Sequence, residues 1–131
     1  GYADVRNHLA SQRLTDFMQT DIFIYHGYTE LFLAGKWVKS TPAFNIEMCQ
    51  RFGVLPLEFD GREDSLFHPF DAAGSKHMEY LKFRGDHADV PAQEIIDAFT
   101  AFYPKAYNES LSIDGDLLAE YEAEQAAKAG R

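Results

Sequence analysis

Residues 22–45, IFIYHGYTELFLAGKWVKSTPAFN, predict a β-hairpin that carries one histidine, His26. Residues 22–33 are mostly β-branched, aromatic or aliphatic, which is typical of a strand covered on both faces. The glycine of the turn at residues 34–35 can adopt positive φ, and residues 36–40 supply the returning strand. We therefore predict a hairpin whose first arm is an interior strand.

The turn at residues 34–35 fixes which residues face one another, and the expected pairs are Leu33 with Lys36, Phe32 with Trp37, Glu30 with Lys39 and Tyr28 with Thr41. Aromatic pairs and acid–base pairs of this kind stabilise a register. The same alternation places His26, Tyr28 and Thr41 on one face, with His26 and Thr41 as diagonal neighbours about 7 Å apart. A lone histidine on a sheet can be a core residue or a catalytic base, and spacing alone leaves both open.

Composition predicts one domain with its own core. The chain has 131 residues, of which 46% are hydrophobic, enough for one core but not for two ordinary domains. We assign residues 1–112 to the core and residues 113–131 to a solvated C-terminal helix, because the latter are rich in Ala and Glu. A formal charge of −9 repels nucleic acid and anionic lipid. The single cysteine, Cys49, excludes an intrachain disulfide.

No apolar run approaches the roughly 20 residues of a membrane-spanning helix. We therefore expect neither a membrane nor a nucleic acid as partner, and we expect a cytoplasmic location; whether the chain forms a homo-oligomer stays open. The other predicted elements are strands at residues 2–7 and 78–83 and helices at residues 8–19, 46–52 and from Pro91 until Pro104 stops the last one. In the helix after Asn45, Ile46, Cys49 and Phe52 are expected to face inward. The pattern predicts an α+β fold, an antiparallel sheet with the His26 hairpin near its centre and helices packed on one side.

The run YHGYTELFLAGKWVKSTPAFN resembles the histidine hairpin of the transglutaminase-like superfamily, in which a pattern close to H-x-W-x-E-x-Y-x-x-G-x-W-x-x-x-D-P-x-F recurs. The matching positions are His26, Tyr28, Glu30, Phe32, Gly35, Trp37, Pro42 and Phe44. One bacterial branch of the superfamily is also similar through ADVRNHLAS, FGVLPLEFDGREDSLFHPFD and HMEY. The resemblance covers about residues 3–104 and implies a papain-like transglutaminase core.

The resemblance also implies a catalytic apparatus. Family members use a cysteine nucleophile at a helix start, the hairpin histidine as general base, and an aspartate on the next strand that orients the imidazole. The thiolate attacks an amide carbonyl, and the acyl group passes to water or an amine. His26 matches the base, while Thr41 stands where the aspartate is expected, with Asn45 or Glu30 as substitutes. Tyr28 and Trp37 match supporting walls of the substrate cleft.

The nucleophile is the larger departure from the family pattern. The family's cysteine lies on a helix before the strand that residues 2–7 begin, and residues 1–131 contain no such helix. Cys49 follows His26 in the chain and shares a short helix with Ile46 and Phe52, so we interpret it as a core residue. The chain is then expected to be either the C-terminal part of a longer protein or a remnant without the chemistry, and to be inactive by itself.

The resemblance therefore implies thiol-dependent acyl transfer or amide hydrolysis on a peptide or protein substrate in the full-length protein, with no cofactor or metal. The alternative is a non-catalytic domain that binds a peptide or protein through the same cleft. A metal-dependent hydrolase ranks third, because His68, His77 and His87 do not form a metal-binding spacing. The turn-rich segment at residues 60–77 is either a hydrogen-bonded surface loop or a border of the cleft.

Overall fold

The computed structural model describes residues 1–103, 105 and 117–130. These residues group into two compact units. The first comprises residues 1–8 and 22–89, and the second comprises residues 9–21 and the described residues from Val90 onward. The assignment of residues 1–131 to one domain stays a prediction, and its inner boundary at residues 112–113 lies outside the described residues.

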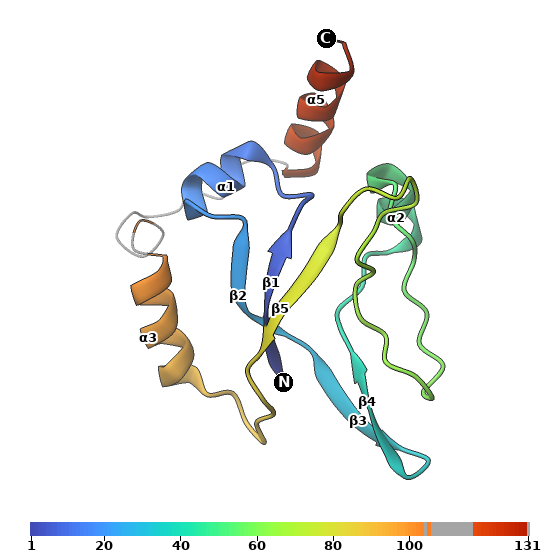
Figure 1. The fold of residues 1–131 in the computed structure, drawn as a ribbon, viewed down its shortest axis with the longest axis vertical. Coiled ribbons are helices and arrows are strands. Elements are labelled where there is room, and N and C mark those ends of the chain that lie inside the picture. The colour runs from blue at the N-terminus through green and yellow to red at the C-terminus, as the bar shows by residue number, and fades with distance from the viewer. Residues whose placement is uncertain (104, 106–116, 131) are drawn as a thin grey trace. The chain divides into compact units, whose positions relative to one another are not determined.

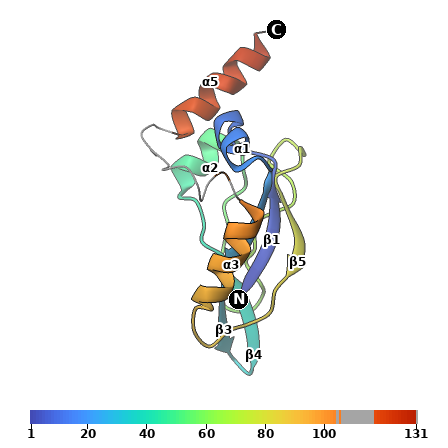
Figure 2. The ribbon, with the colours of Figure 1, turned by 90° about the vertical axis from the view of Figure 1, so that its left-hand side faces the viewer.

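The first unit contains two antiparallel sheets. In the larger, β1 (Tyr2–Asn7) lies between β2 (Ile22–Gly27) and β5 (Met78–Phe83). The smaller is the hairpin of β3 (Thr29–Leu33) and β4 (Lys36–Ser40). Figures 1 and 2 show this hairpin extending away from the three strands. With the helices, these antiparallel sheets confirm the predicted α+β class.

The hairpin has the predicted register. Its pairs include Leu33 with Lys36, Phe32 with Trp37 and Glu30 with Lys39, and the ladder ends where Thr29 meets Ser40. The rings of Phe32 and Trp37 lie 5.3 Å apart, and Lys39 Nζ lies 2.5 Å from Glu30 Oε1. The Tyr28–Thr41 pair lies beyond this ladder, so the predicted alternation does not extend to it.

The prediction of a single interior strand from residue 22 to residue 33 is wrong. The run breaks at Tyr28, which lies between β2, an edge strand of one sheet, and β3, a strand of the other. The break has a packing cause, because the Tyr28 side chain is 7% exposed and belongs to the core cluster with Ala3, Val5 and Met78. Beyond the break, Phe32 is 59% exposed. The hairpin therefore does not lie at the centre of a sheet.

Asp4 anchors the central strand to its neighbours. The register of β1 shifts at this residue toward both β2 and β5, and Tyr25 opposite it has a φ of 55°, a region that aromatic residues rarely adopt. The Tyr25 amide donates to Asp4 Oδ1 at 3.1 Å. Arg84 donates to both carboxylate oxygens, at 2.5 and 2.8 Å, and its guanidinium lies 4.3 Å from the centre of the Tyr25 ring.

The helix α2 (Ile46–Phe52) begins and ends as predicted. Asn45 Oδ1 accepts a hydrogen bond from the Met48 amide at 2.8 Å, and Gly53 ends the helix with a φ of 65°. Cys49 is buried, but Ile46 is 66% exposed. The predicted inward position of Ile46 is therefore wrong, because this helix of two turns buries only a narrow stripe.

The second unit contains α1 (Gln12–Met18), α3 (Ala92–Phe102) and α5 (Leu117–Ala129). The helix α1 begins later than predicted, because Ser11 Oγ accepts a hydrogen bond from the Leu14 amide at 3.2 Å and caps the helix there. Side chains of α5 contact α1: Glu124 accepts the Gln12 amide at 2.9 Å, and Glu120 accepts from Arg13.

We expect Asp4→Asn to lower the free energy of unfolding by about 2 kcal/mol or more, since the substitution leaves the Arg84 guanidinium without its counter-charge in a largely buried place. Urea denaturation of both proteins measures the difference. The matched control is Glu63→Gln, which removes an exposed ion pair with Lys36 and should change stability by less than about 0.5 kcal/mol. Equal effects of the two substitutions would contradict the anchoring role of Asp4.

Candidate functional site

His26 lies on β2, where it pairs with Ala3 of β1. Its ring is half-buried and meets the ring of Phe67 edge to face, with centroids 5.8 Å apart. Burial lowers the pKa of His26 below its ordinary value. Its Nδ1 is buried and has no hydrogen-bond partner among the described residues. The side chain is therefore a neutral imidazole with an unused nitrogen at neutral pH.

An apolar cavity of about 260 Å³ opens beside His26. It is lined by Val5, Asn7, Phe23, His26, Pro42, Ala43, Phe44, Phe67 and Met78. None of these residues carries a formal charge when His26 is neutral. Among the residues that line this cavity, His26 is therefore the one with a titratable side chain.

Thr41 directly follows β4 and is 5% exposed. Its amide donates to the Ser65 carbonyl at 3.0 Å, which ties the end of the hairpin to the segment between α2 and β5. Its Oγ1 is buried and, within the described part of the chain, has no hydrogen bond of normal geometry. The hydroxyl lies near the Tyr80 phenol: burial raises the pKa of Tyr80, and the Phe67 amide and Thr41 hydroxyl oppose that shift.

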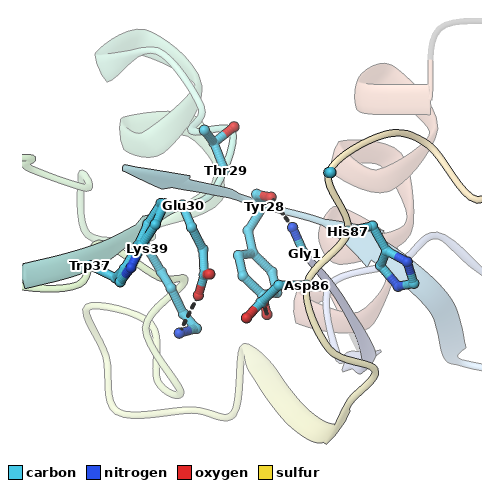
Figure 3. A pocket seen from close by; sticks show the side chains of 9 residues that line it. Gly1, Tyr28, Thr29, Glu30, Trp37, Lys39, Asp86 and His87 are labelled. Atoms are coloured by element: carbon cyan, nitrogen blue, oxygen red, sulfur yellow. Dashed lines mark hydrogen bonds and ion pairs between the residues drawn. The ribbon is translucent and has the colours of Figure 1, made fainter. Parts of the chain in front are cut away.

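A second cavity, of about 830 Å³, is polar and lies beside the hairpin (Figure 3). Its lining residues are Gly1, Tyr28, Thr29, Glu30, Trp37, Lys39, Asp86, His87 and Ala88. The Tyr28 hydroxyl donates to Asp86 Oδ1 at 3.4 Å, and the Gly1 amine donates to the Tyr28 carbonyl at 2.9 Å. Burial, and then the negative charge of Asp86, raise the pKa of Tyr28. Tyr28 is accordingly a neutral donor at this site.

The structure divides the predicted site residues between these places. His26 lines the apolar cavity, Tyr28 and Trp37 line the polar one, and Thr41 lines neither. The two substitute orienting residues are engaged elsewhere, because Glu30 pairs with Lys39 and Asn45 caps α2. The predicted site residues therefore belong to one unit but do not share a single cavity.

Cys49 is buried, as predicted for a core residue, with 3% exposure. Its Sγ lies 3.7 Å from the Phe44 carbonyl oxygen, to which it donates. It does not line either cavity described above. A thiol in this position is a packing group rather than an accessible nucleophile.

His77 and His87, which were considered for a metal site, lie in different environments. His77 is 3% exposed, and its ring meets Phe67 at 5.8 Å. His87 lines the polar cavity. Over the described ranges, no group of three or more His, Cys, Asp or Glu side chains is arranged to hold a metal ion.

Several lining residues were not predicted as site residues. Phe67 and Met78 complete the wall beside His26, and Asp86 and His87 complete the polar cavity. Phe67 comes from the turn-rich segment at residues 60–77, where a border of the cleft was one of two expectations. Asp86 follows β5 in a stretch without a motif, so no sequence signal placed it opposite Tyr28.

Comparison of the chain with protein-family models, with curated proteins and with solved structures found no match to any of them. Among the helices that the structure describes, none combines the length and apolar character needed to cross a lipid bilayer.

We expect the free energy of unfolding to fall as the pH drops below about 6.5, the ordinary pKa of histidine. Burial is the main cause that lowers the pKa of both His26 and His77, so below this pH the unfolded chain binds more protons than the folded chain. The stabilising contribution of the two neutral histidines should be fully present above pH 6.5. It should be lost as the pH falls toward the folded-state pKa values of the two rings. Urea denaturation across this range measures it.

In the variants His26→Gln and His77→Gln, each substitution should flatten part of this pH dependence, and the double variant should flatten most of it. A slope that is unchanged in the double variant would contradict the assignment of the acid sensitivity to these two rings.

We expect the Cys49 thiol to react slowly with an aromatic disulfide reagent in the native protein and fully after unfolding in urea, since the folded chain buries it. The released thiolate is measured by absorbance. In the same 131-residue chain, amine incorporation into a glutamine-containing protein should be absent. Turnover that disappears in Cys49→Ala would overturn the core assignment.

Proposed function

We propose that this chain supplies the general base of a thiol-dependent acyl-transfer or amide-hydrolysis site of the transglutaminase-like kind, with His26 as the base. The sulfur nucleophile would come from outside residues 1–131. The substrate would be an amide of a peptide or protein. The finer fold assignment, a papain-like transglutaminase core, is part of the same proposal.

The buried, unpartnered Nδ1 of His26 carries this proposal. A buried polar atom without a hydrogen bond costs free energy, on the order of 1–3 kcal/mol, and such atoms in folded proteins usually have a functional reason or an absent partner. Burial keeps the ring neutral, which is the form that can accept a proton from a thiol. The cavity beside the ring leaves room for reacting groups.

Thr41 is proposed as the residue that positions the imidazole. Its buried Oγ1 lies near the Tyr80 phenol but, like His26 Nδ1, makes no hydrogen bond of normal geometry to the residues the structure describes. Both atoms therefore keep capacity for a further bond or a bridging water. A hydroxyl can hold the orientation of an imidazole, but it cannot stabilise the imidazolium as a carboxylate does. A base positioned in this way would be weaker than one with an aspartate partner.

A non-catalytic peptide- or protein-binding domain is the second candidate. The polar cavity favours it, because its volume of about 830 Å³ is within the range of ligand sites, about 300–1,000 Å³. Trp37, which is 64% exposed, provides an aromatic contact there, and the Tyr28 hydroxyl oxygen, whose proton is donated to Asp86, can still accept a hydrogen bond. This function needs no nucleophile.

The test is an acyl-transfer assay on the complete reading frame that contains these residues. Amine incorporation into a glutamine-containing protein, and ammonia release, report transfer and hydrolysis. We expect His26→Ala to lower kcat/KM by about 10²- to 10⁴-fold, while Glu63→Gln, at an exposed position outside both cavities, should leave kcat unchanged. Activity that survives His26→Ala, or no activity in the complete protein, would contradict the proposal.

Thr41 is tested in the same assay through the pH profile. Thr41→Asp should shift the acid limb of the kcat profile toward higher pH, because a carboxylate raises the pKa of a neighbouring imidazole. Thr41→Val should lower kcat more than it changes KM. Profiles that are identical in all three proteins would remove Thr41 from the positioning role.

A further inference from the structure

The wall of the cavity beside His26 selects against charged ligands. Its side chains are apolar apart from Asn7 and His26, and burial keeps the imidazole neutral. A charged group placed there would lose its hydration without gaining a counter-charge. Phosphates, carboxylates and ammonium groups are therefore disfavoured as its occupant.

The size of the cavity limits the occupant further. Its volume is about 260 Å³, larger than the roughly 150 Å³ of an apolar cavity that holds a benzene molecule, and below the range of about 300–1,000 Å³ for drug-sized ligands. One ring with a short attachment fills such a space, whereas a fused or extended ligand does not.

The surrounding rings favour an aromatic occupant. Phe67 is the centre of the arrangement: its ring centroid lies 5.6 Å from that of Phe44 and 5.8 Å from that of His26, at interplanar angles of 49° and 70°. Rings attract one another in such tilted geometries. Met78 adds a polarizable thioether to the same wall, and sulfur contacts with ring edges are favourable.

We propose that this cavity binds one uncharged aromatic ring, carried by the substrate next to the amide group on which His26 acts. That the ring belongs to a substrate rests on the proposed function, but the binding of the ring itself does not require catalysis. The apolar cavity is thereby assigned to recognition of the aromatic ring.

The experiment is an NMR titration of the 131-residue chain with small probes. The probes are N-acetylphenylalaninamide, its alanine and aspartate analogues, and benzyl alcohol as a free ring. We expect saturable shifts of the Met78 methyl and His26 ring signals with the phenylalanine probe, and none with the alanine or aspartate probe. Nuclear Overhauser contacts from the bound ring to the Met78 methyl place it in the cavity without any substitution.

A matched pair of variants tests the location. Ala43→Leu narrows the cavity, because Ala43 lines it at an exposed position, and should weaken binding of the phenylalanine probe by at least about tenfold. Ala73→Leu makes the same change in an exposed turn outside the cavity and should alter binding by less than about twofold. Circular dichroism checks that both variants are folded.

The affinities of the two ring-bearing probes distinguish the source of the ring. Tighter binding of N-acetylphenylalaninamide than of benzyl alcohol supports a ring on a peptide substrate, and equal affinities overturn that assignment in favour of a small molecule. No saturable shift with either ring, or equal effects of Ala43→Leu and Ala73→Leu, overturns the binding site itself. These outcomes are separate from the acyl-transfer assay, since loss of activity in His26→Ala with no ring binding would reject this inference and keep the proposed base.

Discussion

The carboxylate of Asp4 is the contact on which the three-stranded sheet depends. It sits on the central strand where the register shifts toward both neighbours, and it accepts bonds from the Tyr25 amide and the Arg84 guanidinium. Without these bonds the left-handed backbone of Tyr25 would be strained with no compensation. Since His26 is the next residue after Tyr25, the same contact also fixes the position of the His26 backbone and so of its imidazole.

Phe67 connects this sheet to the candidate site. Its ring meets His26, Phe44 and His77, and its amide donates a hydrogen bond to the Tyr80 hydroxyl oxygen at 3.4 Å. The segment that carries Phe67 is held to the hairpin by backbone bonds at Ser65, which donates to Lys39 at 2.8 Å and accepts from Thr41 at 3.0 Å. A loop without regular structure thereby supplies the central ring of the apolar wall.

The site separates two kinds of environment over a short stretch of chain. His26 faces neutral, apolar neighbours, which keep its proton affinity low. Two residues later Tyr28 meets Asp86, and Glu30 pairs with Lys39, in a polar cavity with charges of both signs. The change occurs at the break between β2 and β3. A proton-accepting ring and a hydrogen-bonding surface can therefore lie close in sequence without sharing a cavity.

Local sequence patterns are sufficient to predict the Phe32–Trp37 register of the hairpin, the Asn45 and Gly53 ends of α2, and the strands at residues 2–7 and 78–83. Turn chemistry, caps and cross-strand pairs act over a few residues, so a single chain segment contains the information. Tertiary structure alone decided that residues 22–33 divide between two sheets and that Phe67 and Asp86 complete different cavities. These outcomes depend on contacts between distant segments, such as Asp4 with Arg84 and Tyr28 with the core, which no local pattern encodes.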